Sequence, residues 1–430
     1  MKPDNDFSPK IINDLEGLFL ILRIRLGKYF FNFKNYPLFQ RNPIKSIKEI
    51  ISIRNKTTLL KVIKFRGKYY STPSIPSFPS KAYDNMVAKG GLNFSGFGSP
   101  QKLQLDTVLL AITNKCTFNC KHCYEKHNIN IGSEVSVDVW KSAINELQKN
   151  GVSIIVFTGG EPLLSFEKLI ELVKYVDKSK SEVHVHTTGL GLTEGKAIQL
   201  SKAGVSAVAV GLDDFQEERF DVLRGYKGAF NIANKALRTL NNIGILTYIN
   251  SCISKELIKN NGLYKLFELA KSLNVSMIQL LEPRPNGGYL NNFREVQLNE
   301  DEIAVSREFT LIGNTSKKYK DYPLIYNLAF LESPKNFGCL MGGLSHFYID
   351  SKGNVNPCVF LPVSFGNIQE TSIAEIFEKM RKAIPFPLKK ECPSVLLHNS
   401  INHAFTETDR MPVRYESIKT EFNRLYEMES

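Results

Sequence analysis

The sequence lacks an apolar run long enough to cross a membrane. Its most apolar stretch, residues 17–22, is closed by Glu16 and Arg23, whereas a spanning helix needs about 20 apolar residues. The first ten residues, MKPDNDFSPK, also lack the apolar core of a secretory signal because they mix charges with proline. These absences predict a protein of the cytoplasm.

Cysteine is scarce as well. There are seven cysteines among 430 residues, an odd number at uneven spacing. A secreted disulfide framework is normally shorter and denser in cysteine. A chain of this length with 43% hydrophobic residues can bury a sizeable core without disulfides. We therefore expect a reducing compartment in which the thiols are free or bound to metal.

Acidic residues are almost missing from residues 17–68, where thirteen Lys or Arg accompany one acid, Glu49. The excess in this segment equals the formal charge of the whole chain, +12, so the remainder is balanced. Basic side chains among Leu, Ile and Phe are typical either of a solvated helical cap or of a peripheral contact at the inner face of a membrane. No recognisable nucleic-acid module accompanies the charge, so no nucleic acid is expected.

The chain divides into four predicted parts. They are a basic extension with helices and a hairpin (1–104), a region of alternating strands and helices (105–313), a small cysteine-bearing α+β part (314–405) and a terminal helix (406–430). In the extension, Arg66-Gly67 marks the turn of the hairpin, and a proline-serine stretch follows it.

The second part predicts a parallel α/β sheet. Its six expected strands span 107–113, 153–158, 183–187, 207–212, 246–253 and 275–281. Between them lie helical stretches, for which Ser136 is one expected N-cap. Strands that alternate with helices form parallel sheets with right-handed crossovers, and chemistry collects at the carboxyl ends of such strands.

Three cysteines follow the first expected strand. The loop NKCTFNCKHCYEKHN places Cys116, Cys120 and Cys123 in a C-x3-C-x2-C array, so their thiolates can converge on one metal centre. A four-iron cluster on three cysteines leaves one iron open, as a catalytic zinc keeps an open position. The alternatives are three free thiols or a structural zinc with His122 or His127 as fourth ligand, although such zinc sites usually need a second pair of ligands at a distance.

The order of the motifs resembles the radical S-adenosylmethionine (SAM) superfamily. After the cysteine array, FTGGEP ends the second strand, HTTGLG the third and LLEPRPNG the sixth, and VGLDDFQEERFDVLRGYKG contains the fourth. The resemblance covers residues 105–310. It implies a partial (βα)6 TIM-like barrel with a [4Fe–4S] cluster on the three cysteines. It also implies reductive cleavage of SAM to a 5′-deoxyadenosyl radical, which removes hydrogen from an organic substrate.

The GGEP resemblance implies contacts to SAM. Without a Cβ, Gly159 and Gly160 let the backbone approach the SAM amino group closely. Glu161 would hold the ammonium group, and Pro162 would stiffen the exit of the turn. The alternative is an ordinary tight turn with no ligand.

Two further residues match family positions. His122 stands where the family places a ring beside the adenine, and the alternative is an exposed loop histidine. Arg224 in the LRG motif pairs either with the SAM carboxylate or with Asp221 or Glu218 in a surface ion pair.

The sequence departs from the family in the fourth strand. The family often has a serine there that bonds the ribose, whereas this chain has Gly211. The ribose contact then falls to Thr188, to Asp213 or to another polar group.

A second group of cysteines begins with CLMGGLSHFYIDSKGNVNPC. Its Cys339, Gly353 and Cys358 resemble the start of a SPASM or shorter twitch domain, and a hairpin is expected to turn at Lys352-Gly353. A full SPASM domain carries further cysteines and two auxiliary clusters, but here only Cys392 follows. The resemblance therefore implies one auxiliary [4Fe–4S] cluster on three cysteines, with its fourth ligand open. The alternative is that these cysteines are buried hydrophobic residues.

One cysteine belongs to neither group. Cys252 lies near the end of the fifth expected strand, where it is either a core residue or faces the barrel mouth. In the second case its thiol could donate a hydrogen atom during the reaction.

Three readings of the function follow. The SPASM or twitch resemblance implies a peptide or protein substrate, as in ribosomal peptide maturation, with a flavodoxin or ferredoxin as electron donor. The basic segment 17–68 favours a lipid or isoprenoid at the membrane surface instead. A reading of another class is a non-catalytic iron–sulfur or zinc protein on a degenerate barrel.

Overall fold

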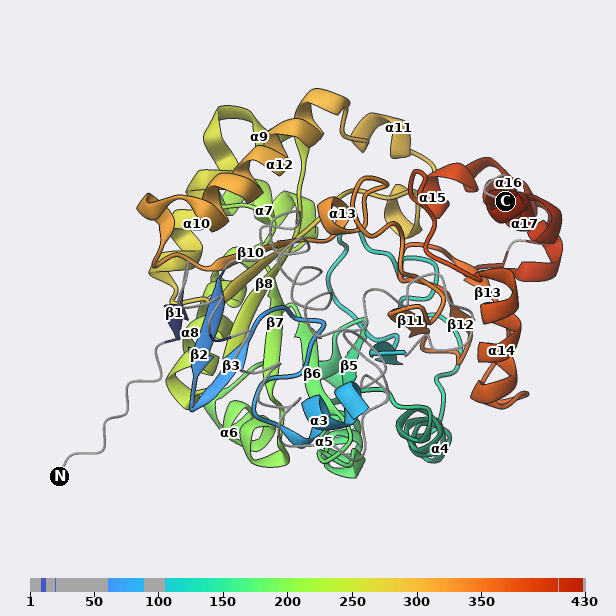
Figure 1. Ribbon diagram of the computed structural model, residues 1–430, viewed down its shortest axis with the longest axis horizontal. Coiled ribbons are helices and arrows are strands. Elements are labelled where there is room, and N and C mark those ends of the chain that lie inside the picture. The colour runs from blue at the N-terminus through green and yellow to red at the C-terminus, as the bar shows by residue number, and fades with distance from the viewer. Residues whose placement is uncertain (1–8, 13–19, 21–60, 89–104, 409, 428–430) are drawn as a thin grey trace, which may run out of the picture.

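Helices wrap a single nine-stranded sheet in this protein (Figure 1). The computed structural model describes residues 9–12, 20, 61–88, 105–408 and 410–427. In the sheet the strands follow the order β10-β9-β8-β7-β6-β5-β4-β11-β12. This α/β architecture confirms the predicted fold class.

All six predicted strands are present within three residues of their expected ends. They are β4 (Thr107–Thr113), β5 (Ile154–Gly159), β6 (Glu182–Thr187), β7 (Ala207–Gly211), β8 (Leu246–Cys252) and β9 (Met277–Leu281). Each pairs in parallel with the next along the chain. Their near-continuous burial explains why the sequence revealed them, because a sheet covered on both faces needs apolar strands.

Helices that follow the strands cover the outside of the barrel (Figure 1). The longer ones are α4 (Val137–Lys149), α5 (Phe166–Tyr175), α6 (Glu194–Ala203), α7 (Glu217–Arg224), α8 (Ala229–Ile243), α10 (Gly262–Ser272) and α12 (Glu300–Thr315). The short helices α9 (Lys255–Ile258) and α11 (Phe293–Val296) follow β8 and β9, and α3 (Lys81–Ala88) precedes β4. The expected N-cap is confirmed, since the Ser136 hydroxyl accepts from the Val139 N–H.

The sheet extends beyond the six predicted strands at both edges. β10 (Leu324–Asn327) pairs in parallel with β9, and β11 (His346–Ile349) pairs in parallel with β4. β12 (Val355–Asn356) turns back on β11 in the predicted hairpin, where Gly353 has a φ of 90°. The expected boundary at residue 313 thus lies inside α12, and strands on its far side belong to the same sheet.

The N-terminal hairpin packs on the sheet. β2 (Val62–Phe65) and β3 (Lys68–Tyr70) pair about Arg66 and Gly67, whose φ angles of 47° and 76° suit a tight hairpin turn. β1 (Lys10–Ile12) pairs with β2, so the helix expected from residue 11 is wrong there. Most of the expected basic helices, 13–19 and 21–60, lie outside the described residues.

The chain ends in short elements beside the hairpin of β11 and β12. They are α13 (Leu328–Leu331), α14 (Ile373–Ala383), α15 (Pro393–Leu396), α16 (His398–Thr408), α17 (Lys419–Glu427), and the pair β13 (Val363–Ser364) and β14 (Val413–Arg414). The single helix expected over 406–430 is therefore wrong, because β14 and a 3₁₀ turn (Tyr415–Ile418) separate α16 from α17.

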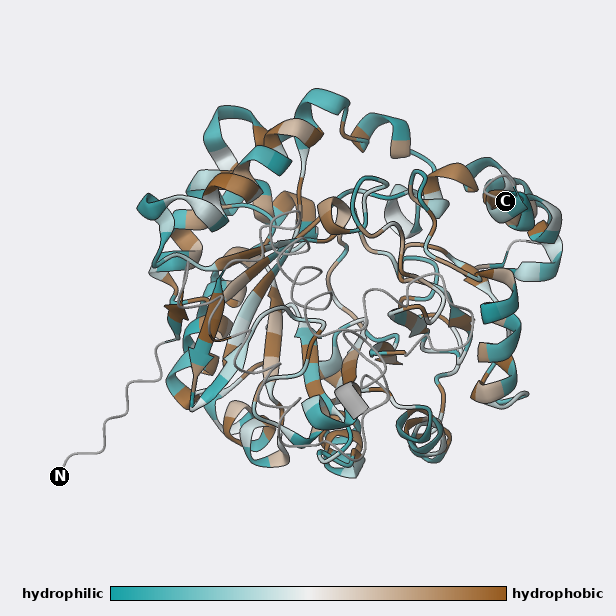
Figure 2. Ribbon diagram, viewed as in Figure 1, coloured by the Kyte–Doolittle hydropathy of each residue, from teal (hydrophilic) through white to brown (hydrophobic). Residues whose placement is uncertain are grey.

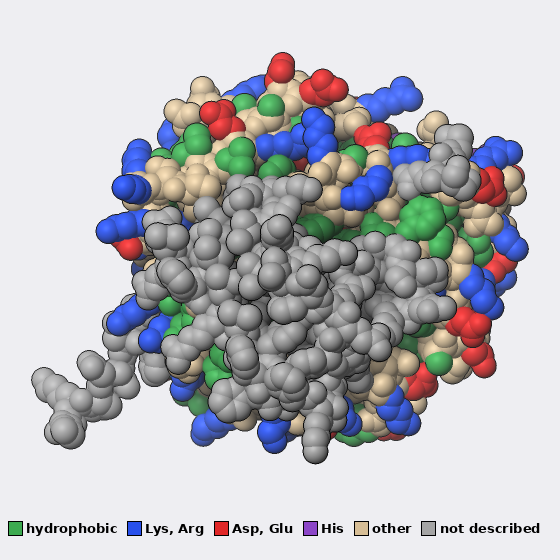
Figure 3. Space-filling model, in the orientation of Figure 1, with side chains coloured by type: hydrophobic (Ala, Val, Ile, Leu, Met, Phe, Trp, Pro, Cys, Tyr) green, Lys and Arg blue, Asp and Glu red, His purple; other side chains and the backbone are tan. Residues whose placement is uncertain are grey.

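Apolar residues gather on the strands and on the inward sides of the helices (Figure 2). On the described surface in Figure 3, basic and acidic side chains are interspersed rather than separated by sign. None of the described helices is long and apolar enough to cross a bilayer.

Candidate active site

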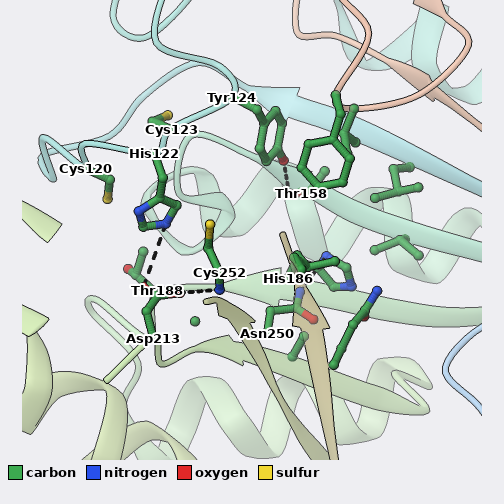
Figure 4. A pocket seen from close by; sticks show the side chains of 18 of the residues that line it. Cys120, His122, Cys123, Tyr124, Thr158, His186, Thr188, Asp213, Asn250 and Cys252 are labelled. Atoms are coloured by element: carbon green, nitrogen blue, oxygen red, sulfur yellow. Dashed lines mark hydrogen bonds and ion pairs between the residues drawn. The ribbon is translucent and has the colours of Figure 1, made fainter. Parts of the chain in front are cut away.

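Most of the predicted site residues line one cavity at the carboxyl ends of the parallel strands (Figure 4). The cavity has a volume of about 250 Å³. The predicted residues that line it are Cys116, Cys120, His122, Cys123, Gly159, Gly160, Thr188, Asp213, Arg224, Cys252 and Cys358. The fold thus brings together residues from four separate motifs, as expected where strand-to-helix loops meet.

The cysteine loop, residues 114–128, lies directly against the GGEP turn. The Gly160 N–H donates to the Thr113 carbonyl, and the Glu161 N–H donates to the Lys115 carbonyl, both at 2.8 Å. A Cβ on Gly160 would lie 2.4 Å from the Lys115 carbonyl oxygen, so only glycine fits. The missing side chain of Gly160 therefore lets the GGEP turn pack closely against the cysteine loop.

A helix and a further strand-to-helix loop hold the same segment. The Lys121 N–H donates to the Leu223 carbonyl of α7 at 2.9 Å. The Gly288 N–H, after β9, donates to the Cys123 carbonyl at 2.9 Å. The backbone between the second and third cysteines is thus fixed from both sides, which pre-organises the thiols.

The three thiols suit a group that takes thiolates. Burial raises the pKa of Cys116 to about 11 and also raises the pKa of Cys120, so these thiols need a cation beside them to ionise. One cation is already close, because the Arg224 Nη1 lies 3.9 Å from the Cys120 Sγ.

The chemistry of the three donors suits an iron–sulfur cluster, because such clusters are held by cysteine thiolates. Among the described residues, no three His, Cys, Asp or Glu side chains are grouped closely enough to hold one metal ion. The histidines that a zinc site would need are engaged elsewhere: His122 faces Asp213 at 3.7 Å, and His127 lines a separate small cavity.

Arg224 pairs with Asp213. Its Nη2 lies 2.7 Å from the Asp213 Oδ2, and both side chains are buried. The alternative was an ion pair with Asp221 or Glu218. The ion pair with Asp221 is wrong, because that carboxylate accepts from backbone N–H groups at the start of α8. Asp213 is held in turn by the Cys252 N–H at 2.8 Å.

Gly211 makes room for this ion pair. A Cβ at this position would lie 2.3 Å from the Arg224 Nη2 and 2.9 Å from its Cζ. The family's serine therefore cannot stand here while the guanidinium keeps its place. The departure seen in the sequence follows from the position of Arg224 in this chain.

Glu161 does not line the cavity with the other predicted residues. Its buried carboxylate accepts from the Thr187 hydroxyl, from the Thr188 N–H and hydroxyl, and from the Leu163 N–H, at 2.5–2.9 Å. Burial raises the pKa of Glu161, and these four donors oppose that shift. All its described contacts are thus within the protein. They tie the end of β5 to the end of β6, and Pro162 begins the short turn that follows.

Sequence analysis missed a row of polar side chains inside the barrel. The His186 Nε2 lies 2.9 Å from the Tyr248 hydroxyl, and the Asn250 Nδ2 lies 3.2 Å from the His186 Nδ1. These three residues and Gln279 line the cavity. The signal was present in the sequence, because polar residues recur at every second position of β6 and β8, which places them on one face.

A second cavity, of about 180 Å³, is lined by Cys339, Cys358 and Cys392. Cys358 and Cys392 are half-buried rather than packed in the core, which disfavours the reading of all three as plain hydrophobic residues. Cys358 and Arg284 line both cavities, so the two candidate sites share a wall. Cys252 lines the first cavity, so it faces the barrel mouth.

Comparisons with known proteins agree with the presence of two separate cysteine sites. A model of the radical SAM superfamily matches residues 110–256. A model of SPASM, an iron–sulfur cluster-binding domain, matches residues 339–394. The first match covers the cysteine loop and the strands to β8, and the second covers the three C-terminal cysteines.

Curated relatives include enzymes of two kinds. The AdoMet-dependent heme synthase of Oleidesulfovibrio alaskensis is 28% identical over 289 residues, which are 62% of this chain and 73% of that protein. The PqqA peptide cyclase of Gluconobacter oxydans is 25% identical over 285 residues, covering 63% of this chain and 76% of that protein.

The fold is similar to that of SuiB from Streptococcus suis. With SAM bound, SuiB matches with a TM-score of 0.54 at 15% identity, over 70% of this chain and 75% of SuiB. With its precursor peptide SuiA bound, it matches with a TM-score of 0.53 at 13% identity, over 85% of this chain and 82% of SuiB.

Proposed function

Since this chain is a radical SAM enzyme with a SPASM domain, we propose that it modifies a peptide by removing a hydrogen atom from it. When bound, the [4Fe–4S] cluster supplies the electron that cleaves SAM to methionine and a 5′-deoxyadenosyl radical. The reductant in this proposal is a flavodoxin or a ferredoxin. Three thiols, those of Cys116, Cys120 and Cys123, would hold the cluster and leave one iron for the amino and carboxylate groups of SAM.

The remaining residues of the first cavity would orient SAM. The Arg224 guanidinium, fixed by Asp213, is placed to pair with the SAM carboxylate. His122 lies beside the same ion pair, and burial lowers its pKa to about 4, so its ring is neutral and suited to lie against an adenine. Thr188 lines the same cavity and remains the candidate for the ribose. By enclosing the reactants, the cavity would keep water from the radical.

The distribution of charge in the first cavity is the observation that favours a peptide substrate. Among its described residues, Arg224 is paired with Asp213, and Arg284 is paired with Glu282 at 2.9 Å. Burial lowers the pKa of His186 to about 3, so this ring is neutral. In this proposal Arg224 is shared by Asp213 and the SAM carboxylate and Arg284 is taken up by Glu282, so neither arginine is left for the substrate. The other polar groups of the inner wall named above are neutral. Neutral hydrogen-bonding groups of this kind suit amides and uncharged side chains.

A tetrapyrrole is the competing substrate, since some relatives are named heme synthases. Haem is a large planar ring with carboxylate side chains, and it would need unpaired cations in a roomy site. The described wall offers paired arginines around about 250 Å³. These observations favour the peptide.

The lipid alternative depended on residues 17–68, most of which lie outside the described residues. Two of the described cations of that segment bind the barrel. The buried Lys61 Nζ donates to the Tyr319 carbonyl at 2.7 Å and the Tyr322 carbonyl at 3.0 Å, and Arg66 donates to the Gly244 carbonyl at 2.9 Å. These contacts favour the alternative interpretation of the segment, a cap on the barrel.

The test compares substrates in oxygen-free reconstituted enzyme with SAM and dithionite. We expect short peptides encoded beside its own gene to accelerate 5′-deoxyadenosine formation, and the peptide that does so to be altered at the carbon from which the hydrogen atom is removed. Fe-coproporphyrin III is the control substrate. Acceleration by the porphyrin with haem as product, and none by any of the peptides, would overturn the proposal.

A further inference from the structure

The second cavity has three thiols, and this chain has no fourth to offer. The seven cysteines of the sequence are residues 116, 120, 123, 252, 339, 358 and 392, and all of them lie within the described ranges. The first three line the first cavity, and so does Cys252, which does not line the second. A four-iron cluster on Cys339, Cys358 and Cys392 therefore leaves one corner for a donor other than cysteine.

Glu332 lies at this cavity, directly after α13. Its side chain is 16% exposed and lines the cavity with the three cysteines. The segment that follows Glu332 folds back on itself, since the Phe337 N–H donates to the Leu331 carbonyl and the Gly338 N–H donates to the Ser333 carbonyl, both at 3.1 Å. This turn returns the chain to the same cavity at Cys339, so the carboxyl group and the three thiols face one space.

The surroundings leave this carboxylate without a dedicated cation. The Glu332 Oε1 is 3.9 Å from the His346 Nδ1, which is beyond hydrogen-bond distance. Arg284 is the other nearby cation, and it is already paired with Glu282 at 2.9 Å. A buried carboxylate is costly unless it is paired or binds a metal. An iron at the open corner would supply the missing positive charge.

We propose that Glu332 is the fourth protein ligand of the auxiliary cluster held by Cys339, Cys358 and Cys392. Carboxylate oxygen is an ordinary ligand for iron, and non-cysteine ligands occur in iron–sulfur centres. The inference rests on the proposed ligation by the three cysteines but not on the nature of the substrate. The two sites would then differ in kind: the first keeps an open iron for SAM, whereas the second is closed by the protein.

The experiment isolates the second cluster in the full chain. Cys116, Cys120 and Cys123 are all changed to alanine, and this parent is reconstituted without oxygen, with about four irons expected per chain. The reduced cluster is examined by electron paramagnetic resonance, with and without cyanide as a small ligand for an open iron. The parent is compared with Glu332→Gln and with Glu391→Gln, which alters another acid lining the same cavity.

We expect cyanide to shift the spectrum of Glu332→Gln but not that of the parent or of Glu391→Gln. Glu332→Cys should restore a cluster that does not respond to cyanide, even if Glu332→Gln loses its iron. A parent that responds to cyanide as Glu332→Gln does would overturn the proposal, as would a response confined to Glu391→Gln. A parent that binds no iron would instead overturn the three-cysteine site itself.

Discussion

The two cysteine sites share a wall but are built differently. In the first, the ligands come from a single loop of eight residues, 116–123. Backbone hydrogen bonds fix this loop and the residues just before it to the GGEP turn, to α7 and to the loop after β9. In the second, Cys339, Cys358 and Cys392 come from three segments, and each must be placed by the fold around it. The first site can therefore be recognised from spacing, whereas the second depends on knowing which distant residues meet.

The way each site is held differs as well. The Cys339 N–H and carbonyl pair with Leu388 at 2.9 and 3.3 Å, so this cysteine is positioned by a bridge between two distant segments. Cys392 precedes α15, and its Sγ lies 3.2 Å from the Ser394 Oγ. Such a site is assembled last, once the sheet and its C-terminal additions have packed. We expect the two sites to fail in different ways.

The largest expected effect comes from removing one cysteine from each site and comparing which product is lost. Cys116→Ala removes a ligand of the SAM-binding cluster, so 5′-deoxyadenosine formation should fall to the level without enzyme. Cys339→Ala should keep that reaction and lose the modified peptide, because the first loop does not depend on the second site. Chromatography of both products and iron counts per chain give the measurement. Equal loss of 5′-deoxyadenosine in both variants would break the comparison.

The second prediction concerns the support of the first loop. Gly160→Ala places a methyl group against the Lys115 carbonyl, which must move. We expect a loss of about 1–3 kcal/mol in the free energy of unfolding, as for overpacked sites, together with less iron in the first cluster. The measurements are urea unfolding and iron content.

Gly195→Ala is the matched control, because a Cβ there meets nothing nearer than the Thr193 Oγ1 at 3.9 Å. It lies in α6, where alanine is favoured over glycine. If both variants unfold alike and keep the same iron content, Gly160 does not hold the loop.

A third, smaller effect tests the departure from the family. Gly211→Ser introduces the residue that the family often has, but its Cβ would meet the Arg224 guanidinium. We expect the guanidinium to leave Asp213 and the KM for SAM to rise about tenfold, which corresponds to about 1.4 kcal/mol. Steady-state formation of 5′-deoxyadenosine gives this value. An unchanged or lower KM would show that Arg224 has no part in SAM binding.

The sequence predicted what is local and missed what is distant. The six buried strands and both hairpins were predicted because apolar runs, turn glycines and helix faces are properties of neighbouring residues. β10 was missed because it has only four residues. The parallel pairing of β11 with β4 was missed because these two strands lie far apart in the sequence. The partners of Glu161 were missed for the same reason, since Thr187 and Thr188 belong to the next strand.

The seventh cysteine, Cys252, belongs to neither group of three cysteines, yet it lines the first cavity. Burial raises the pKa of its thiol, which therefore keeps the hydrogen that a substrate radical could take. The sulfur radical left behind would be restored by one electron from the proposed flavodoxin or ferredoxin and one proton from solvent.

If Cys252 returns hydrogen to the substrate, product made in D₂O should carry deuterium at the reacting carbon, because thiol hydrogen exchanges with solvent. Cys252→Ala should lower that deuterium content. It should change the KM for SAM less than Gly211→Ser does, since Asp213 is held by the backbone N–H of residue 252 and not by its side chain. Mass spectrometry of the product distinguishes the cases. The same deuterium content in the variant and the parent enzyme would mean that the thiol gives no hydrogen, and that its place at the cavity is one of packing alone.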